Sequence, residues 1–172
     1  YFVQQTGQTE EGFYLNNHSQ LLQSIKSAKA RGKKVLLIGV SYALLDWAEE
    51  LKGKYDFSGV TIMETGGMKG RRREMIREEL HAQLKKGFGV DTIHSEYGMT
   101  ELLSQGYSKG NGLFYTGQTM QILLRDLNDP FDIGLHHRSG GINVIDLANF
   151  YSCSFIATQD LGKSIGNGKT EI

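Results

Sequence analysis

The chain has 172 residues, of which 39% are hydrophobic and 22% charged, and its 19 basic and 19 acidic residues leave no formal net charge. These proportions are those of a globular protein, and the balanced charge gives no indication of a nucleic-acid-binding surface. No apolar run approaches the roughly 20 residues of a membrane span, and no secretory signal pattern opens the sequence.

The single cysteine, Cys153, can form neither an internal disulfide nor a cysteine-rich zinc site, so we expect a reducing, cytoplasmic setting. Because free cysteine is often buried, we expect Cys153 in the core and not as a nucleophile. The 22 glycines beside one proline predict many tight turns and close backbone approaches.

Residues 1–16 have no clear period and are expected to form a loop. Apolar residues then recur at helical spacing from Asn17 or Ser19 to about Gly32, which predicts the first helix. The continuous apolar run over 35–40 is typical of a strand buried on both faces of a parallel sheet.

Hydrophobic spacing predicts further helices over 43–51 and 71–84, and strands over 60–64 and 91–94. Strands and helices that alternate in this way predict right-handed βαβ units and a parallel sheet. Ligands bind beyond the carboxyl ends of such strands. The pair Gly66-Gly67 follows one of these ends.

Beyond residue 105 the pattern becomes mostly β. Glycines punctuate a loop from 106 to 117, and strands are expected over 120–125, 142–147 and 154–158, with a hairpin turn at Asn167-Gly168. The expected fold class is therefore α/β, with a nucleotide-binding portion over 1–105 and a β-rich portion over 106–172 of the same domain.

The sequence Tyr-Gly-Met-Thr-Glu at residues 97–101 combines several binding chemistries. Tyr97 offers a flat face on which a purine base can stack, and Gly98 lets the backbone turn and approach a ligand. The Thr100 hydroxyl can donate to a phosphate oxygen, and Glu101 suits a Mg²⁺ ion that also binds nucleotide phosphates. The alternative is an ordinary turn with an exposed tyrosine and a Thr-Glu pair that starts a helix.

This motif resembles the Tyr-Gly-x-Thr-Glu signature of the acyl-adenylate-forming superfamily, which includes acyl-CoA ligases, peptide-synthetase adenylation domains and luciferases. The chain is most similar to the acyl-protein synthetase branch that activates fatty acids for bacterial bioluminescence, with phenylacetate-CoA ligases as near relatives. The resemblance implies that Tyr97 stacks on adenine and that Thr100 and Glu101 are catalytic. In this family Thr100 would contact the adenylate phosphate, and Glu101 would help to hold Mg²⁺.

Two other segments are similar to parts of this family. Gly66 and Gly67 stand where a glycine-rich segment lines the adenine and acyl pocket, although Met68 follows in place of an acidic residue. Asp160 stands where the Asp of a Thr-Gly-Asp segment accepts hydrogen bonds from the ribose hydroxyls, although Gln159 replaces the usual glycine. Each segment alone could be an ordinary turn.

The remaining polar residues give weaker signals. The histidines form no set at metal-ligand spacing, but His94 precedes the motif and could line the acyl pocket. The run Arg71 to Arg73 could grip CoA or pyrophosphate, or could be a solvated helix face. No Gly-x-Ser-x-Gly motif of a serine hydrolase is present.

The resemblance implies part of an enzyme that binds ATP and Mg²⁺, with CoA as a candidate further cofactor, and joins a fatty or aryl carboxylate to AMP. The acyl group would then pass to a thiol of CoA, a carrier or a partner protein such as an acyl reductase. The family's phosphate loop is expected before Tyr1 and its mobile C-terminal domain after Ile172. Adenylation by these 172 residues alone would contradict the resulting expectation of a partial nucleotide site without turnover.

Two other classes of function remain open from the sequence. One is a non-catalytic nucleotide- or acyl-binding module of the same fold. The other is an interaction domain in which the motif is idle.

Overall fold

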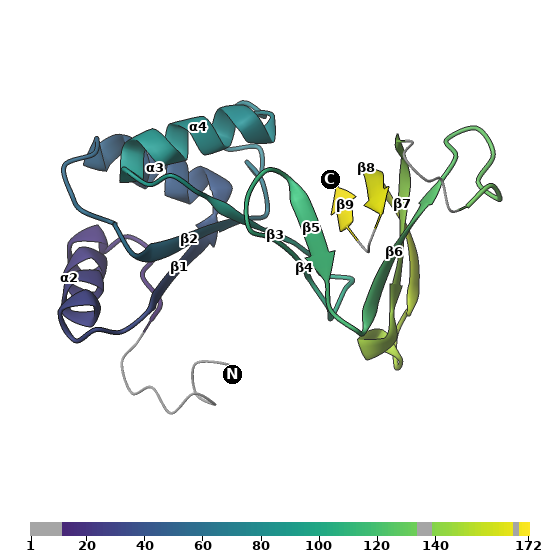
Figure 1. Cartoon of the computed structure of the whole chain (residues 1–172), viewed down its shortest axis with the longest axis horizontal. Coiled ribbons are helices and arrows are strands. Elements are labelled where there is room, and N and C mark those ends of the chain that lie inside the picture. The colour runs from purple at the N-terminus through teal and green to yellow at the C-terminus, as the bar shows by residue number, and fades with distance from the viewer. Residues whose placement is uncertain (1–11, 134–138, 167–168) are drawn as a thin grey trace. The chain divides into compact units, whose positions relative to one another are not determined.

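The computed structural model describes residues 12–133, 139–166 and 169–172 (Figure 1). The chain divides into two compact units, one ending at Val35 and the other running from Leu36 to Ile172. Element labels follow Figure 1, and each unit is described by itself.

The first unit contains the helix α2 (His18–Ala30). Asn17 caps its first turn, since the Asn17 side chain accepts a hydrogen bond of 3.1 Å from the backbone N–H of Gln20. The chain leaves the helix through Gly32, whose φ of +69° is open to glycine without steric cost. The helix predicted from Asn17 or Ser19 to about Gly32 is confirmed.

A mixed sheet organises the second unit, and its described strands follow the order β1-β2-β3-β4-β5-β9-β8-β7-β6. β2 pairs with β3 in parallel, and the pairs from β3 to β6 for which register is resolved are antiparallel. The predicted α/β class, with a parallel unit followed by a mostly β part, is confirmed. The strands are β1 (Val35–Val40), β2 (Val60–Thr65), β3 (His94–Tyr97), β4 (Gly106–Ser108), β5 (Leu113–Thr116), β6 (Met120–Arg125), β7 (Ser139–Asp146), β8 (Phe155–Gly166) and β9 (Lys169–Glu171).

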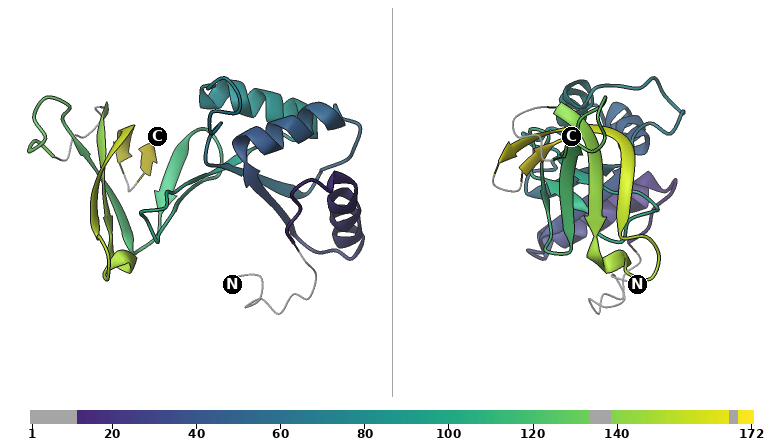
Figure 2. Two further views of the ribbon diagram at one scale, coloured as in Figure 1. Left: turned by 180° about the vertical axis from the view of Figure 1, so that it is seen from behind. Right: turned by 90° about the vertical axis from the view of Figure 1, so that its right-hand side faces the viewer.

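Two helices, α3 (Ser41–Leu51) and α4 (Arg77–Phe88), lie side by side on one face of β2 and β3 (Figures 1 and 2). Trp47, Phe57 and Phe88 meet edge to face beneath them, with ring centroids 5.1 to 5.7 Å apart. Aromatic pairs in this geometry contribute about 0.5–1.5 kcal/mol each beyond the area that they bury. This aromatic cluster joins α3, α4 and the connection that leads into β2.

The helix predicted over 71–84 begins six residues later, at Arg77. Its first turn carries Glu78 and Glu79, which favour the positive end of the helix dipole, whereas three successive arginines would oppose it. The arginines lie in the connection after β2 instead. Arg72 there forms ion pairs with Asp46 and Glu49 of α3, and its bonds hold the pKa of Glu49 below its usual value.

Several strand predictions need correction, and those over 142–147 and 154–158 lie at Ser139–Asp146 and Phe155–Gly166. The run over 35–40 is a strand, but Leu36 and Ile38 are 57% and 49% exposed, so it is not buried on both faces. β1 is the end strand of the order, and only Leu37 is turned into the core. The strand expected over 91–94 lies at His94–Tyr97 and so includes the tyrosine of the motif. The glycine-rich segment expected to be a loop contains β4 and β5.

The predicted hairpin turn at Asn167-Gly168 lies outside the described residues, between β8 and β9. Within the part of the chain that the structure describes, no helix combines the length and hydropathy needed to cross a bilayer.

Helices α3 and α4 touch where α4 has a glycine. A Cβ on Gly87 would lie 2.5 Å from the Ala48 Cβ and 2.7 Å from the Ala48 carbonyl oxygen. We predict that Gly87→Ala lowers the free energy of unfolding by about 1–3 kcal/mol, because overpacking outweighs the gain in helix propensity. Urea denaturation measures this change.

Gly117→Ala is the matched control, because a Cβ at Gly117 would meet no atom within 4 Å and its backbone is not in the left-handed region. Equal free energies of unfolding for the two variants would contradict the prediction that a Cβ at position 87 cannot be accommodated between the helices.

Candidate functional site

A cleft of about 460 Å³ lies where β2 and β3 end. Gly66 and Gly67 follow β2, Tyr97 and Gly98 end β3, and Asp160 reaches the same cleft from β8. Segments separated by more than 60 residues in the sequence therefore converge on one hollow. Five of the seven residues singled out from the sequence lie here.

A hydrogen bond joins two of these residues across the cleft. The Tyr97 hydroxyl donates to the Asp160 Oδ2 over 2.7 Å. Burial raises the pKa of Tyr97, and the bond to Asp160 raises it further, so the phenol remains a donor at neutral pH. The ring of Tyr97 also meets Phe114 edge to face at 6.2 Å. Tyr97 is thus fixed at its edge and at its hydroxyl.

Asp160 is held in place by a second set of bonds. The Thr158 hydroxyl accepts from the backbone N–H of Asp160 at 3.1 Å and donates to the Ile142 carbonyl at 3.2 Å. The Thr158 carbonyl accepts from the Arg125 guanidinium at 2.7 Å. Gln159, in place of the usual glycine, is accommodated within strand β8.

The turn after β2 requires glycine. Gly66 and Gly67 have φ values of +73° and +65°, a region that residues with a Cβ rarely occupy. A Cβ on Gly67 would meet no atom within 4 Å, so the backbone there is open to an approaching ligand. Gly98 is restricted by space instead, since its Cβ would lie 3.3 Å from the Glu96 Oε1.

A buried polar network lies under the cleft and was not foreseen from the sequence. Glu64 of β2 accepts from the Ser41 hydroxyl of α3 at 2.7 Å and lies 3.4 Å from His81 Nε2 of α4. The same imidazole nitrogen lies 3.2 Å from the Ser95 hydroxyl of β3. All four residues are buried. The Ser41 hydroxyl also contacts the Thr65 carbonyl, next to the glycine turn.

The network keeps the Glu64 carboxylate charged. Burial alone raises the pKa of Glu64, but hydrogen bonds with His81, Ser95 and Ser41, and the charge of His81, outweigh it and lower the pKa below its ordinary value of 4.5. A period-two pattern could have revealed this residue, because Val60, Ile62 and Glu64 are the inward positions of β2. An acid in that pattern requires a partner.

The wall of the cleft is partly polar and partly apolar, and methionine and leucine side chains form its apolar part. Met68 and Leu80 are buried, and Met75 and Met99 are partly buried beside them. Methionine side chains are flexible and adapt to irregular apolar ligands.

Thr100 and Glu101 are not brought into this cleft. Both are exposed and line a neighbouring depression of about 370 Å³ together with Asn149 and Tyr151. The motif therefore has two parts in space, with Tyr97 and Gly98 at the cleft and Thr100 and Glu101 beside it.

The protein offers only part of the ligand set for a Mg²⁺ ion. Among the residues that the structure describes, no three potential metal ligands cluster together. Glu101 is a single exposed carboxylate, and Mg²⁺ commonly combines one or two carboxylates with substrate phosphates and water. The donor set therefore suits a metal that arrives with a nucleotide, and not a metal held by protein alone.

Two further expectations are corrected. Cys153 is exposed and not in the core, because it lies in the connection between β7 and β8, where its thiol donates to the Phe155 carbonyl. His94 does not line the cleft. It borders a different hollow with Phe57 and Val60, at the opposite end of the strands.

Comparison with solved structures identifies the fold. The chain is similar to ATP-bound MatB from Rhodopseudomonas palustris, with 16% identity and a TM-score of 0.62 over 92% of this chain and 33% of that one. It is similar to 2-hydroxyisobutyryl-CoA ligase in complex with 2-HIB-AMP and CoA, with 10% identity and a TM-score of 0.63 over 93% of this chain and 36% of that one. The N-terminal subdomain of Klebsiella oxytoca NpsA, in complex with 3-hydroxybenzoyl-AMSN, matches with 10% identity and a TM-score of 0.59 over 92% of this chain and 45% of that one.

These structures are adenylate-forming enzymes, and the likeness shows that the chain has a corresponding fold. The chain spans about a third to under a half of their length. No protein-family model matches the sequence, and no curated protein matches it.

The lowered pKa of Glu64 predicts a pH-dependent contribution to stability. Because the folded state favours the carboxylate, the contribution is present above the ordinary pKa of 4.5 and is lost as the pH falls through the lowered value. We predict that Glu64→Gln lowers the free energy of unfolding at pH 7 by roughly 1–3 kcal/mol. The difference from the unsubstituted protein should shrink below about pH 4.5.

Denaturant titrations across this pH range measure the difference, with the exposed Glu171→Gln as control. A Glu64→Gln effect that is the same at every pH would contradict the charged network.

Proposed function

We propose that this chain, which has the fold of adenylate-forming enzymes, forms the adenosine-binding part of an ATP-dependent enzyme that activates a carboxylic acid as its acyl adenylate. The observation that carries the proposal is the 2.7 Å bond between Tyr97 and Asp160, beside the turn at Gly66 and Gly67. The similar structures contain ATP, an acyl-AMP with CoA, and an acyl-AMP analogue, respectively. Binding of ATP, and of CoA as one acceptor, is proposed here by that analogy.

The residues of the cleft divide the recognition of adenosine between them. The half-buried ring of Tyr97 offers a face to adenine, and base stacking on an aromatic ring contributes about 1–3 kcal/mol. The Asp160 carboxylate has about four acceptor positions, one of which receives the Tyr97 hydroxyl. The other positions suit two ribose hydroxyls. Gly66 and Gly67 let the base and sugar approach the backbone.

Thr100 and Glu101 are assigned to the phosphate end. The Thr100 hydroxyl would donate to a phosphate oxygen, and Glu101 would supply a carboxylate oxygen to a Mg²⁺ that the nucleotide brings. The substrate carboxylate attacks the α-phosphorus of ATP, the bond from that phosphorus to the β-phosphate oxygen breaks, and pyrophosphate leaves as the acyl-AMP anhydride forms. The part played by the protein is alignment and neutralisation of charge.

The apolar part of the cleft wall supports a fatty or aryl carboxylate as substrate. Met68, Met75, Leu80 and Met99 line the cleft beside the proposed adenosine site. We propose that a thiol of CoA, a carrier or a partner protein such as an acyl reductase then attacks the acyl carbon, which forms a thioester and releases AMP. Acyl-protein synthetase activity is the most specific form of this proposal, and acyl-CoA ligase activity is its nearest alternative.

Carboxylate-dependent ATP–pyrophosphate exchange by the full-length protein tests the proposal. We expect exchange that rises with one fatty or aryl acid. Glu101→Ala should lower kcat by about 100-fold or more, as the loss of a group that stabilises developing charge does elsewhere. Asp160→Ala should chiefly raise the KM for ATP.

Variants of Tyr97 separate the ring from the hydroxyl. Tyr97→Ala should weaken ATP binding by about 5- to 150-fold, the equivalent of the stacking energy, whereas Tyr97→Phe keeps the ring and should lose less. AMP binding without exchange for any acid would favour a non-catalytic binding module. A protein that neither binds AMP nor catalyses exchange would favour an interaction domain.

A further inference from the structure

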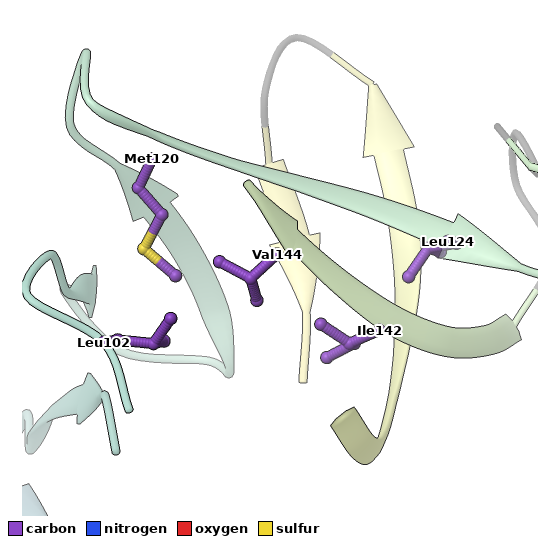
Figure 3. Close-up of a cluster of buried hydrophobic side chains, with 5 residues drawn as sticks. All are labelled: Leu102, Met120, Leu124, Ile142 and Val144. Atoms are coloured by element: carbon purple, nitrogen blue, oxygen red, sulfur yellow. The ribbon is translucent and has the colours of Figure 1, made fainter. Parts of the chain in front are cut away.

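The segment that carries the motif alternates between anchored and exposed residues. Tyr97 and Met99 pack against a hydrophobic cluster, and Leu102 belongs to it with only 5% of its surface exposed. Figure 3 shows Leu102 directed toward Met120 and Val144 of the neighbouring strands. Between these anchors Thr100 and Glu101 face outward.

A buried carboxylate holds the end of this segment. Asp146, at the end of β7, is fully buried and accepts from the backbone N–H groups of Leu103 and Ser104 at 2.7 and 2.9 Å. Its other oxygen accepts from the Ser104 hydroxyl at 2.7 Å and from the Ala148 N–H at 3.1 Å. Burial alone raises the pKa of Asp146, but these hydrogen bonds outweigh it and lower the pKa.

A side-chain amide holds the middle of the segment. Asn149, in the short helix η1 (Leu147–Asn149), donates through Nδ2 to the Glu101 carbonyl at 2.7 Å and to the Cys153 carbonyl at 3.0 Å. This amide thus fixes the backbone of the residue whose carboxylate is exposed. Asn149 is itself buried and borders the depression that Thr100 and Glu101 line.

The side chains of Thr100 and Glu101 have no resolved hydrogen bond or ion pair among the described residues. Their orientation therefore depends on the backbone between Met99 and Leu103. That backbone is constrained by Leu102 from the core, by Asn149 at Glu101, and by Asp146 at Leu103.

We infer that Asn149 and Asp146 are positioning residues for acyl activation, which hold the backbone of Glu101 so that Thr100 and Glu101 meet the phosphate end of the nucleotide. The inference rests on the proposed function. It predicts that substitutions lower kcat and leave the KM for ATP nearly unchanged. The reason is that the adenosine contacts at Gly66, Tyr97 and Asp160 lie outside the backbone that Asn149 and Asp146 hold.

The test compares variants of Asn149 in ATP–pyrophosphate exchange by the full-length protein. Asn149→Ala removes both donated hydrogen bonds, and the isosteric Asn149→Asp keeps the shape but places acceptors against two carbonyls. We expect kcat to fall by about 10- to 100-fold, since a misplacement of about 1 Å can cost that much. The KM for ATP should change little.

Asp129→Asn is the matched control. Asp129 also accepts a backbone N–H with its carboxylate, from Phe131 at 3.1 Å, but in an exposed turn apart from the motif. Thermal unfolding of each variant checks that the assay temperature lies well below the unfolding transition of that variant. Asn149→Ser, whose hydroxyl can still donate once, replaces Asn149→Ala if the latter does not fold.

A lower kcat with unchanged KM in folded Asn149 variants, and normal kinetics in Asp129→Asn, would support the inference. Unchanged kcat, or a loss equal to the unfolded fraction alone, would overturn it while leaving the proposed function intact. Absence of exchange in the unsubstituted protein would reject the proposed function, and the positioning role with it.

Discussion

A single buried carboxylate, that of Glu64, sets the arrangement on which the cleft depends. Taking an isolated charge out of water is costly, and the cost is offset only when partners are placed around it. Here the direct partners are Ser41 of α3 and His81 of α4, and the imidazole of His81 is joined in turn to the Ser95 hydroxyl of β3. These elements must lie close together for the buried carboxylate to be hydrogen-bonded. The network therefore holds the ends of β2 and β3, which border the cleft, in place.

Asp146 has a comparable role in the antiparallel part. It is fully buried, and its donors lie in the segment after the motif and in η1. The stretch from Tyr97 to Ser104 thus lies between two buried acids. Glu64 lies at the cleft, and Asp146 bonds to the end of the stretch at Leu103 and Ser104. Hydrogen bonds to buried charges are roughly twice as strong as neutral ones, which suits segments without regular secondary structure.

Much of this fold follows from local pattern. The runs at Val35–Val40 and Met120–Arg125 are strands with the predicted bounds, because the first is continuously apolar and the second has apolar residues at alternate positions. The convergence of Gly66, Tyr97 and Asp160 was expected from strand ends and from the family resemblance, and the three residues line one cleft. Their roles in binding remain proposals.

Other features could not be predicted because they depend on contacts between distant residues. Asp146 and Asn149 are unremarkable in the sequence, and their importance comes from partners as far as 43 and 48 residues away. Glu64 stands out only as an acid at an inward position of β2, and its partners in α3 and α4 lie 23 and 17 residues away. The short strands β4 and β5 lie in a glycine-rich segment and form because β3 and β9 pair with them. Cys153 is exposed because it falls in a connection, which overrides the usual preference of cysteine for the core.

Within the motif segment, the packed residues are under selection for stability, and the exposed residues are under selection for chemistry. Tyr97, Met99 and Leu102 contribute to the packing of the protein, and substitutions there would be opposed by loss of stability. Thr100 and Glu101 are exposed and contribute little to it, so they are free to drift once their chemistry is no longer needed. A descendant that had lost catalysis would keep the tyrosine and the apolar residues and change only the threonine and glutamate. Among related chains, the state of those two positions would therefore distinguish working enzymes from folded remnants.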